Sequence, residues 1–172
     1  MISSFFRNIK MKIQDMKTIS QLCLGAEQYA QQYGENRPGA EHFLLASLDL
    51  QDGSAQKVLA KLGVNHIDVK EALKAQHNSV LASMGVGSEV INLASDMPKE
   101  TNPSIALYDT KPSGQMVMKK LYENNKMRKT PLKSIHVIEV VLSMQYGTAI
   151  RVLQNIGVDL EALKKVTRAE CY

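Results

Sequence analysis

Two stretches of the sequence, His42–Val64 and His136–Val158, repeat one another without a gap. Nine of the 23 paired positions are identical, among them Gly53 with Gly147. An internal repeat indicates an architecture built from equivalent units. Because units this short bury little apolar surface alone, we expect the two copies to face each other about a pseudo-twofold axis and to share one core.

The periodicity inside each copy indicates helices. In the first copy, apolar residues follow the spacing of one buried helical stripe, at Ile19, Leu22, Cys23, Ala26, Tyr29, Ala30 and Tyr33. Residues that favour helix starts mark the helices of each copy, at Asp15, Ser54 and Asn65 and again at Thr110, Ser134, Thr148 and Asp159. The second helix of the first copy is predicted to run from about Glu41, which gives four helices per copy. No segment alternates with a period of two. The fold class is therefore predicted to be all-α, with two four-helix repeats in one compact eight-helix domain.

The boundaries follow from this pattern. Repeat one is predicted over 15–77 and repeat two over 110–169, and together they form a compact domain over 15–172. The connector over 78–109 is expected to include a helical turn near Glu89–Ala94. Residues 1–14 are expected to form a frayed arm, with a short amphipathic membrane anchor as the alternative. In repeat two, Lys120 and Glu123 stand where repeat one has core residues, so its first helix is expected to be rotated or slipped.

Composition narrows the functional classes. With 44% apolar and 22% charged residues, the chain has the composition of a globular domain, and no apolar run approaches a membrane span. Two cysteines are too few for a disulfide scaffold, which favours the cytoplasm. A net charge of +4 leaves nucleic-acid binding as one alternative function, through Lys119, Lys120, Lys126, Arg128, Lys129 and Lys133.

The assembled motifs resemble the Clp N-terminal domain, or Clp repeat domain. The resemblance is carried by Gly34, by the pair Glu41-His42, and by the segments Gly53-Ser54-Ala55 and Leu62-Gly63-Val64. It implies an eight-helix module that docks adaptors and substrates for Clp unfoldases. The sequence contains no phosphate-binding loop of the form GxxxxGK[ST]. We therefore expect a non-enzymatic protein-interaction module without cofactors. Its expected role is that of an adaptor or regulator of Clp-dependent proteolysis. Its expected partners are proteins or peptides, and no membrane partner is expected.

The resemblance also implies a ligand contact at Glu41. In some relatives, the glutamates of two Glu-His pairs receive the guanidinium of phosphoarginine. Here the second glutamate is replaced by Ile135, and the threonine that precedes the first pair is replaced by Ala40. Glu41 alone is thus the predicted contact for a peptide or for phosphoarginine.

Histidines offer the other candidate chemistry. His42 and His136 open equivalent helices, and this symmetry favours packed histidines that bond to neighbouring backbone; a catalytic partner such as Ser54 is the alternative. His136 and Glu139 are spaced i, i+3, as two metal ligands could be. A small metal-dependent hydrolase is therefore the second alternative function, although no third ligand is visible.

Overall fold

The computed structural model describes residues 2–87, 109–126 and 128–171, with side chains from residue 9 onward. Over these residues the chain is helical and contains no strand, so the predicted all-α class is confirmed. The helices are α1 (Ile2–Gln32), α2 (Ala40–Leu48), α3 (Ser54–Ala60), α4 (His66–Ser83), α6 (Pro112–Asn125), α7 (Ser134–Leu142), α8 (Thr148–Asn155) and α9 (Leu160–Cys171). None of the described helices is both long and apolar enough to cross a membrane.

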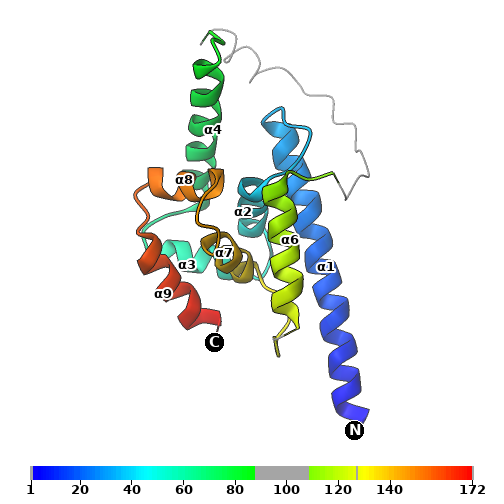
Figure 1. The fold of residues 1–172 in the computed structure, drawn as a ribbon. Helices are drawn as coiled ribbons and strands as arrows, with labels where there is room; N and C mark the ends of the chain where they lie inside the picture. Colours follow the sequence, from blue (N-terminus) through cyan, green and yellow to red (C-terminus); the bar gives the residue numbers. More distant parts are fainter. Residues whose placement is uncertain (1, 88–108, 127, 172) are drawn as a thin grey trace.

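The two equivalent helices α2 and α7 form the centre of the core. Every residue of α2 is buried, and all but Glu139 of α7 are buried. These helices contact each other, while α1 packs on α2 and α6 packs on both (Figure 1). Further contacts cross between the repeats: α3 packs on α7 and α9, and α8 packs on α2 and α4. Neither repeat could bury its apolar face without the other.

Two reciprocal hydrogen bonds join the repeats where α3 meets α7. The backbone N–H of Ala55 donates to Oγ of Ser134 at 2.9 Å, and the N–H of Ile135 donates to Oγ of Ser54 at 3.1 Å. Each serine is the first residue of its own helix and satisfies a free amide of the facing helix. Asp52 accepts a further hydrogen bond from the N–H of Ser134, at 3.0 Å.

The first helix of repeat two is slipped, as its sequence predicts. The two histidine-led segments align at a spacing of 94 residues. On α6, however, the buried apolar side chains are those of Val117 and Leu121, which match Leu22 and Ala26 of α1 at a spacing of 95 residues. The slip by one residue turns Lys120 out of the core.

The helix start expected at Asp15 is wrong, because α1 runs without a break from Ile2. The frayed arm expected over 1–14 stays a prediction. Asp15 lies within this helix, buried, and accepts a hydrogen bond from the N–H of Leu132 at 2.6 Å. Its side chain therefore serves a contact between repeats that local sequence could not reveal.

The fourth helix ends later than its sequence pattern predicts. α4 continues to Ser83, because the residues after 77 keep helical hydrogen bonding. The helical turn expected at Glu89–Ala94 lies outside the described residues. The division of the chain into 15–77, 78–109 and 110–169 remains a prediction.

Candidate functional site

The predicted contact Glu41 lies in the first turn of α2. The N–H of Gly39 donates to Nδ1 of His42 at 3.0 Å, which closes the start of the helix. A Cβ atom at Gly39 would collide with the Glu41 carboxylate. Glycine at this position therefore lets the carboxylate of Glu41 fold back against the chain, where the residue is only 4% exposed.

Lys111, at the N-terminus of α6, neutralises Glu41 from the other repeat. Its Nζ lies 3.0 Å from Oε1 of Glu41 and also forms an ion pair with Glu35. Burial by itself would lower the pKa of Lys111, but the hydrogen bond that it donates to Glu35 and the charge of Glu41 raise it. The carboxylate that the sequence offers to a ligand is therefore already paired with an internal ammonium group.

His42 completes a cluster of potential metal ligands. The ligand atoms of Glu35, Glu41 and His42 all lie within 4.8 Å of one another. Burial lowers the pKa of His42, against the opposite effect of the two glutamates, so the imidazole is neutral as a ligand must be. Lys111 nevertheless contacts both carboxylates and supplies the positive charge that a metal ion would bring. The arrangement fits an internal ion-pair cluster better than a metal site.

A pocket of about 200 Å³ opens beside this cluster. Leu73 and Val80 of α4 supply apolar wall, and Thr148 and Arg151 of α8 lie at its edge. Within the described part of the chain, Arg151 is exposed and forms no ion pair. The pocket thus combines an apolar wall, a neutralised carboxylate and an unpaired cation.

The structure gives the two equivalent histidines equivalent structural roles. Nδ1 of His136 accepts a hydrogen bond from the N–H of Lys133 at 2.9 Å, which matches the bond between His42 and Gly39. Burial lowers the pKa of His136, and the charge of Arg128 acts in the same direction. This confirms the interpretation of both residues as packed histidines that bond to neighbouring backbone.

The alternative catalytic arrangements do not assemble among the described residues. Ser54 bonds to the opposite repeat and to Asp52 instead of approaching His42. Glu139 lines a groove whose lining does not include His136. In the described ranges, the one group of three potential metal ligands is the cluster at Glu35, and no third ligand joins His136 and Glu139.

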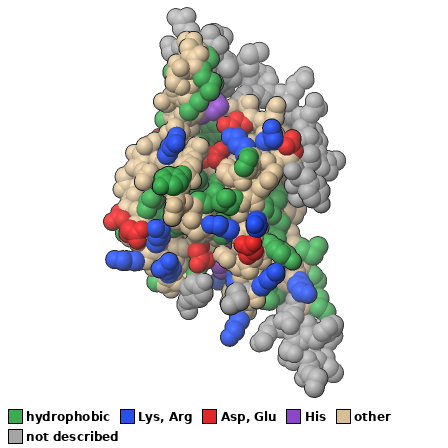
Figure 2. Space-filling model, viewed as in Figure 1, with side chains coloured by type: hydrophobic (Ala, Val, Ile, Leu, Met, Phe, Trp, Pro, Cys, Tyr) green, Lys and Arg blue, Asp and Glu red, His purple; other side chains and the backbone are tan. Residues whose placement is uncertain are grey.

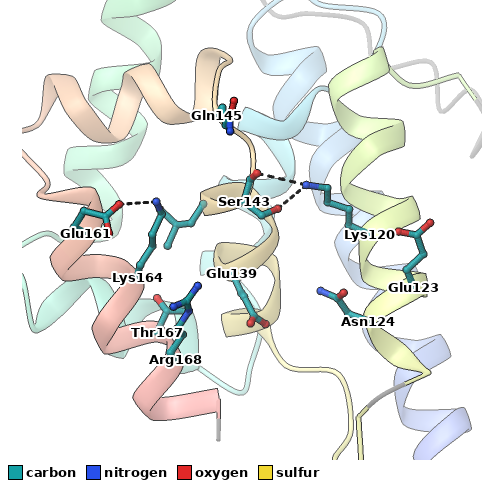
Figure 3. Close-up of a pocket in the computed structure, with 11 residues that line it drawn as sticks. Lys120, Glu123, Asn124, Glu139, Ser143, Gln145, Glu161, Lys164, Thr167 and Arg168 are labelled. Carbon is teal, nitrogen blue, oxygen red and sulfur yellow. Dashed lines mark hydrogen bonds and ion pairs between the residues drawn. The ribbon is translucent and has the colours of Figure 1, made fainter.

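The groove around Glu139 has a volume of about 570 Å³ and lies between α6, α7 and α9 (Figure 3). Opposite charges are interleaved along it. Lys120 donates to Oγ of Ser143 at 2.8 Å, and Lys164 forms an ion pair with Glu161 at 2.6 Å. In repeat one, the position equivalent to Glu139 is Leu45, which is fully buried. The groove is therefore a consequence of the slipped helix and of polar substitution in repeat two.

The basic residues proposed for nucleic-acid binding do not form one surface. Lys120 donates a hydrogen bond to Ser143, and Arg128 lies half-buried beside Asp15, with their charged atoms 3.4 Å apart. The other four are exposed, namely Lys119, Lys126, Lys129 and Lys133. Two of the six cations thus serve internal contacts, which weakens this alternative.

Sequence reasoning missed three residues of the Glu41 site. Glu35 and Lys111 belong to different repeats, and Arg151 lies on α8 of the second repeat. In the sequence, the one signal for Lys111 is its position before Pro112, at the start of a helix. In the structure, its backbone N–H donates to the carbonyl of Pro38 in the other repeat. That its side chain contacts Glu41 follows only from the way the two repeats pack together.

Comparison with known proteins supports the motif-based resemblance. The family model of the Clp repeat (R) N-terminal domain matches residues 17–100. No curated protein matches the chain. The matched segment contains Glu35, Glu41 and the α4 wall of the pocket, whereas Lys111 and Arg151 lie beyond it. Over residues 17–100 the chain is therefore similar to the Clp repeat (R) N-terminal domain family, as its motifs indicate.

Proposed function

We propose that this chain is a non-enzymatic protein-interaction module that binds polypeptide segments in the pocket beside Glu41. Its role would be that of an adaptor or regulator for a Clp-type unfoldase in the cytoplasm. The observation that carries the proposal is the position of the pocket: it opens at the Glu-His pair of a Clp repeat domain and is bordered by both repeats.

The pocket's chemistry indicates the kind of segment that it would bind. A volume of about 200 Å³ suits one or two side chains better than a folded surface. Leu73 and Val80 offer an apolar wall, while Arg151 offers an unpaired charge. An apolar side chain next to a carboxylate would satisfy both features, because Arg binds carboxylates with bidentate geometry.

The internal ion pair favours the same ligand class. A ligand guanidinium that approached Glu41 would have to displace Lys111, which is held by two carboxylates. Displacement would leave the ammonium group without its partners in a partly buried position, and this is costly. Acidic or neutral segments meet no such cost.

Affinity capture with the full chain as bait tests the proposal. A Val80→Glu variant places a charge on the apolar wall, and Arg151→Glu reverses the free cation. Met84→Glu is the matched control, because Met84 follows the same helix, is 73% exposed and lies outside the pocket lining. Mass spectrometry should find an unfoldase, its adaptors or its substrates with the wild type and the control, and lose them with both pocket variants.

Two results would contradict the proposal. Recovery of no chaperone, protease or substrate at low and high salt would remove the Clp-linked role. Recovery of the same proteins with Val80→Glu and Arg151→Glu, at wild-type amounts, would show that binding occurs elsewhere on the molecule.

A further inference from the structure

A stripe of apolar side chains on α1 remains uncovered by the rest of the molecule. Ile9, Ile13, Met16 and Leu24 are 38%, 62%, 72% and 54% exposed. At 3.6 residues per turn, these four positions fall within an arc of about 80°. Core residues such as Leu22 lie on another side of the helix. α1 therefore has two apolar faces, and only one of them packs against the domain.

Lysines flank this exposed stripe on both sides. The same helical geometry places Lys10 and Lys17 along one edge and Lys12 along the other, and all three are exposed. Between residues 9 and 26 the sole acidic residue is Asp15, which is buried against the second repeat. Basic and apolar side chains lie next to each other where α1 leaves the body (Figure 2). From Ile9 to Lys17, the exposed face is therefore apolar in its middle and cationic along its edges.

The position of the stripe leaves it open to a broad surface. The N-terminal part of α1 extends past the other helices (Figure 1). In the sequence, apolar residues at positions 2, 5 and 6 continue the spacing of the stripe. A planar partner could thus reach this half of the helix without meeting the domain.

We propose that the N-terminal half of α1 docks the domain on an anionic lipid surface. An amphipathic helix with lysines beside its apolar face lies in the membrane interface, with the apolar side chains among the acyl chains. The aliphatic stems of Lys10, Lys12 and Lys17 allow their ammonium groups to reach lipid phosphates. The helical N-terminal part of α1 agrees with the short amphipathic membrane anchor that the sequence allowed as the alternative for residues 1–14.

The charge pattern argues against a second copy of the chain as the occupant. Ile9, Ile13 and Met16 have the four- and three-residue spacing of a coiled-coil seam, which places Lys10 and Lys17 at one flank and Lys12 at the other. A parallel pair would set Lys12 beside Lys17 of the second copy. An antiparallel pair would set like flanks together, again lysine beside lysine. An anionic surface converts the same charges into attraction.

Vesicle flotation with the full chain tests the proposal. The probe vesicles contain phosphatidylcholine alone or phosphatidylcholine with phosphatidylserine. We expect binding to the anionic vesicles only, and a loss of about tenfold or more for the Ile13→Asp/Met16→Asp variant. The matched control is Met84→Asp/Tyr146→Asp, which adds the same charge at sites that are 73% and 85% exposed; it should bind like the wild type.

A second variant separates the charges from the apolar stripe. Replacement of Lys10, Lys12 and Lys17 by Gln should lower binding to anionic vesicles by about tenfold or more, and high salt should weaken the wild type similarly. Failure of the wild type to float with anionic vesicles would overturn the proposal, as would unchanged binding by Ile13→Asp/Met16→Asp. A dimer in sedimentation analysis that this variant dissociates would assign the stripe to a second copy and would also overturn it.

Discussion

At the α3–α7 end of the core, two serines cap each other's helices, whereas the related α8–α2 end holds a lysine between two glutamates. The first end has Ser54, Ser134 and Asp52 in one hydrogen-bonded network. At the second end, Ala40 replaces the serine and Lys111 bridges Glu35 and Glu41. The first end therefore joins the repeats by a serine–aspartate network, and the second adds an ion-pair cluster to its hydrogen bonds.

The different polar residues at the two ends show how a scaffold built from two repeats can have a binding site at one end only. The hydroxyl at position 134 satisfies an amide of α3 in the other repeat, and Ala40 has no hydroxyl to do the same for α8. Likewise, the carboxylate of Glu41 has no equivalent at Ile135. Backbone architecture is shared because it depends on buried apolar positions, while the polar residues at the two ends are free to diverge.

The largest expected effect tests whether the two central helices contribute equally to the core. Leu45 is fully buried, and its equivalent Glu139 lines a groove. Leu45→Ala should lower the free energy of unfolding by about 2–5 kcal/mol because it leaves a cavity. Glu139→Ala should lower it by less than about 1 kcal/mol, since its side chain is partly solvated. Urea unfolding followed by circular dichroism measures both, and equal losses would contradict the comparison.

A smaller effect is expected at the serine network. Ser134→Ala removes an acceptor for the N–H of Ala55 and should cost about 1–2 kcal/mol of stability. Ala40→Ser introduces the hydroxyl at the opposite end and should stabilise the fold by a smaller amount. Ser83→Ala is the control, because its hydroxyl bonds locally at an exposed helix end. If Ser134→Ala unfolds at the same urea concentration as the control, the cross-repeat caps contribute nothing.

The sequence allowed the scaffold to be predicted because its signals are local or repeated. Apolar spacing, the glycines and the cap at Asn65, whose side chain accepts hydrogen bonds from two amides of α4, all act within a few residues. Asp15 and Lys111 could not be interpreted in this way. Both have contacts at least 70 residues away in the other repeat, so their roles depend on how the repeats cross.

The two buried histidines should make stability depend on pH. Burial lowers the pKa of His42 and of His136, while an unfolded histidine titrates near 6.5. Below that pH the unfolded state binds more protons, so the free energy of unfolding should fall as the pH falls from about 7 to about 5.5. His42→Asn and His136→Asn keep an acceptor for the helix amide and should each flatten this slope. A slope that neither variant changes would assign the pH dependence to other groups.

The smallest expected effect concerns phosphoarginine, for which the two ends differ most in chemistry. At the α3–α7 end, a guanidinium beside Ile135 would find no carboxylate at that position and would leave its donors unpaired. At the other end, Glu41 could offer bidentate geometry, but Lys111 already lies 3.0 Å from it. Calorimetry with free phosphoarginine should therefore detect no site, or one weak site that Glu41→Ala abolishes. A stoichiometry of two, or binding that survives Glu41→Ala, would contradict this account of the two ends. Phosphoarginine would then bind in spite of the missing carboxylate at Ile135 or independently of Glu41 and its partner Lys111.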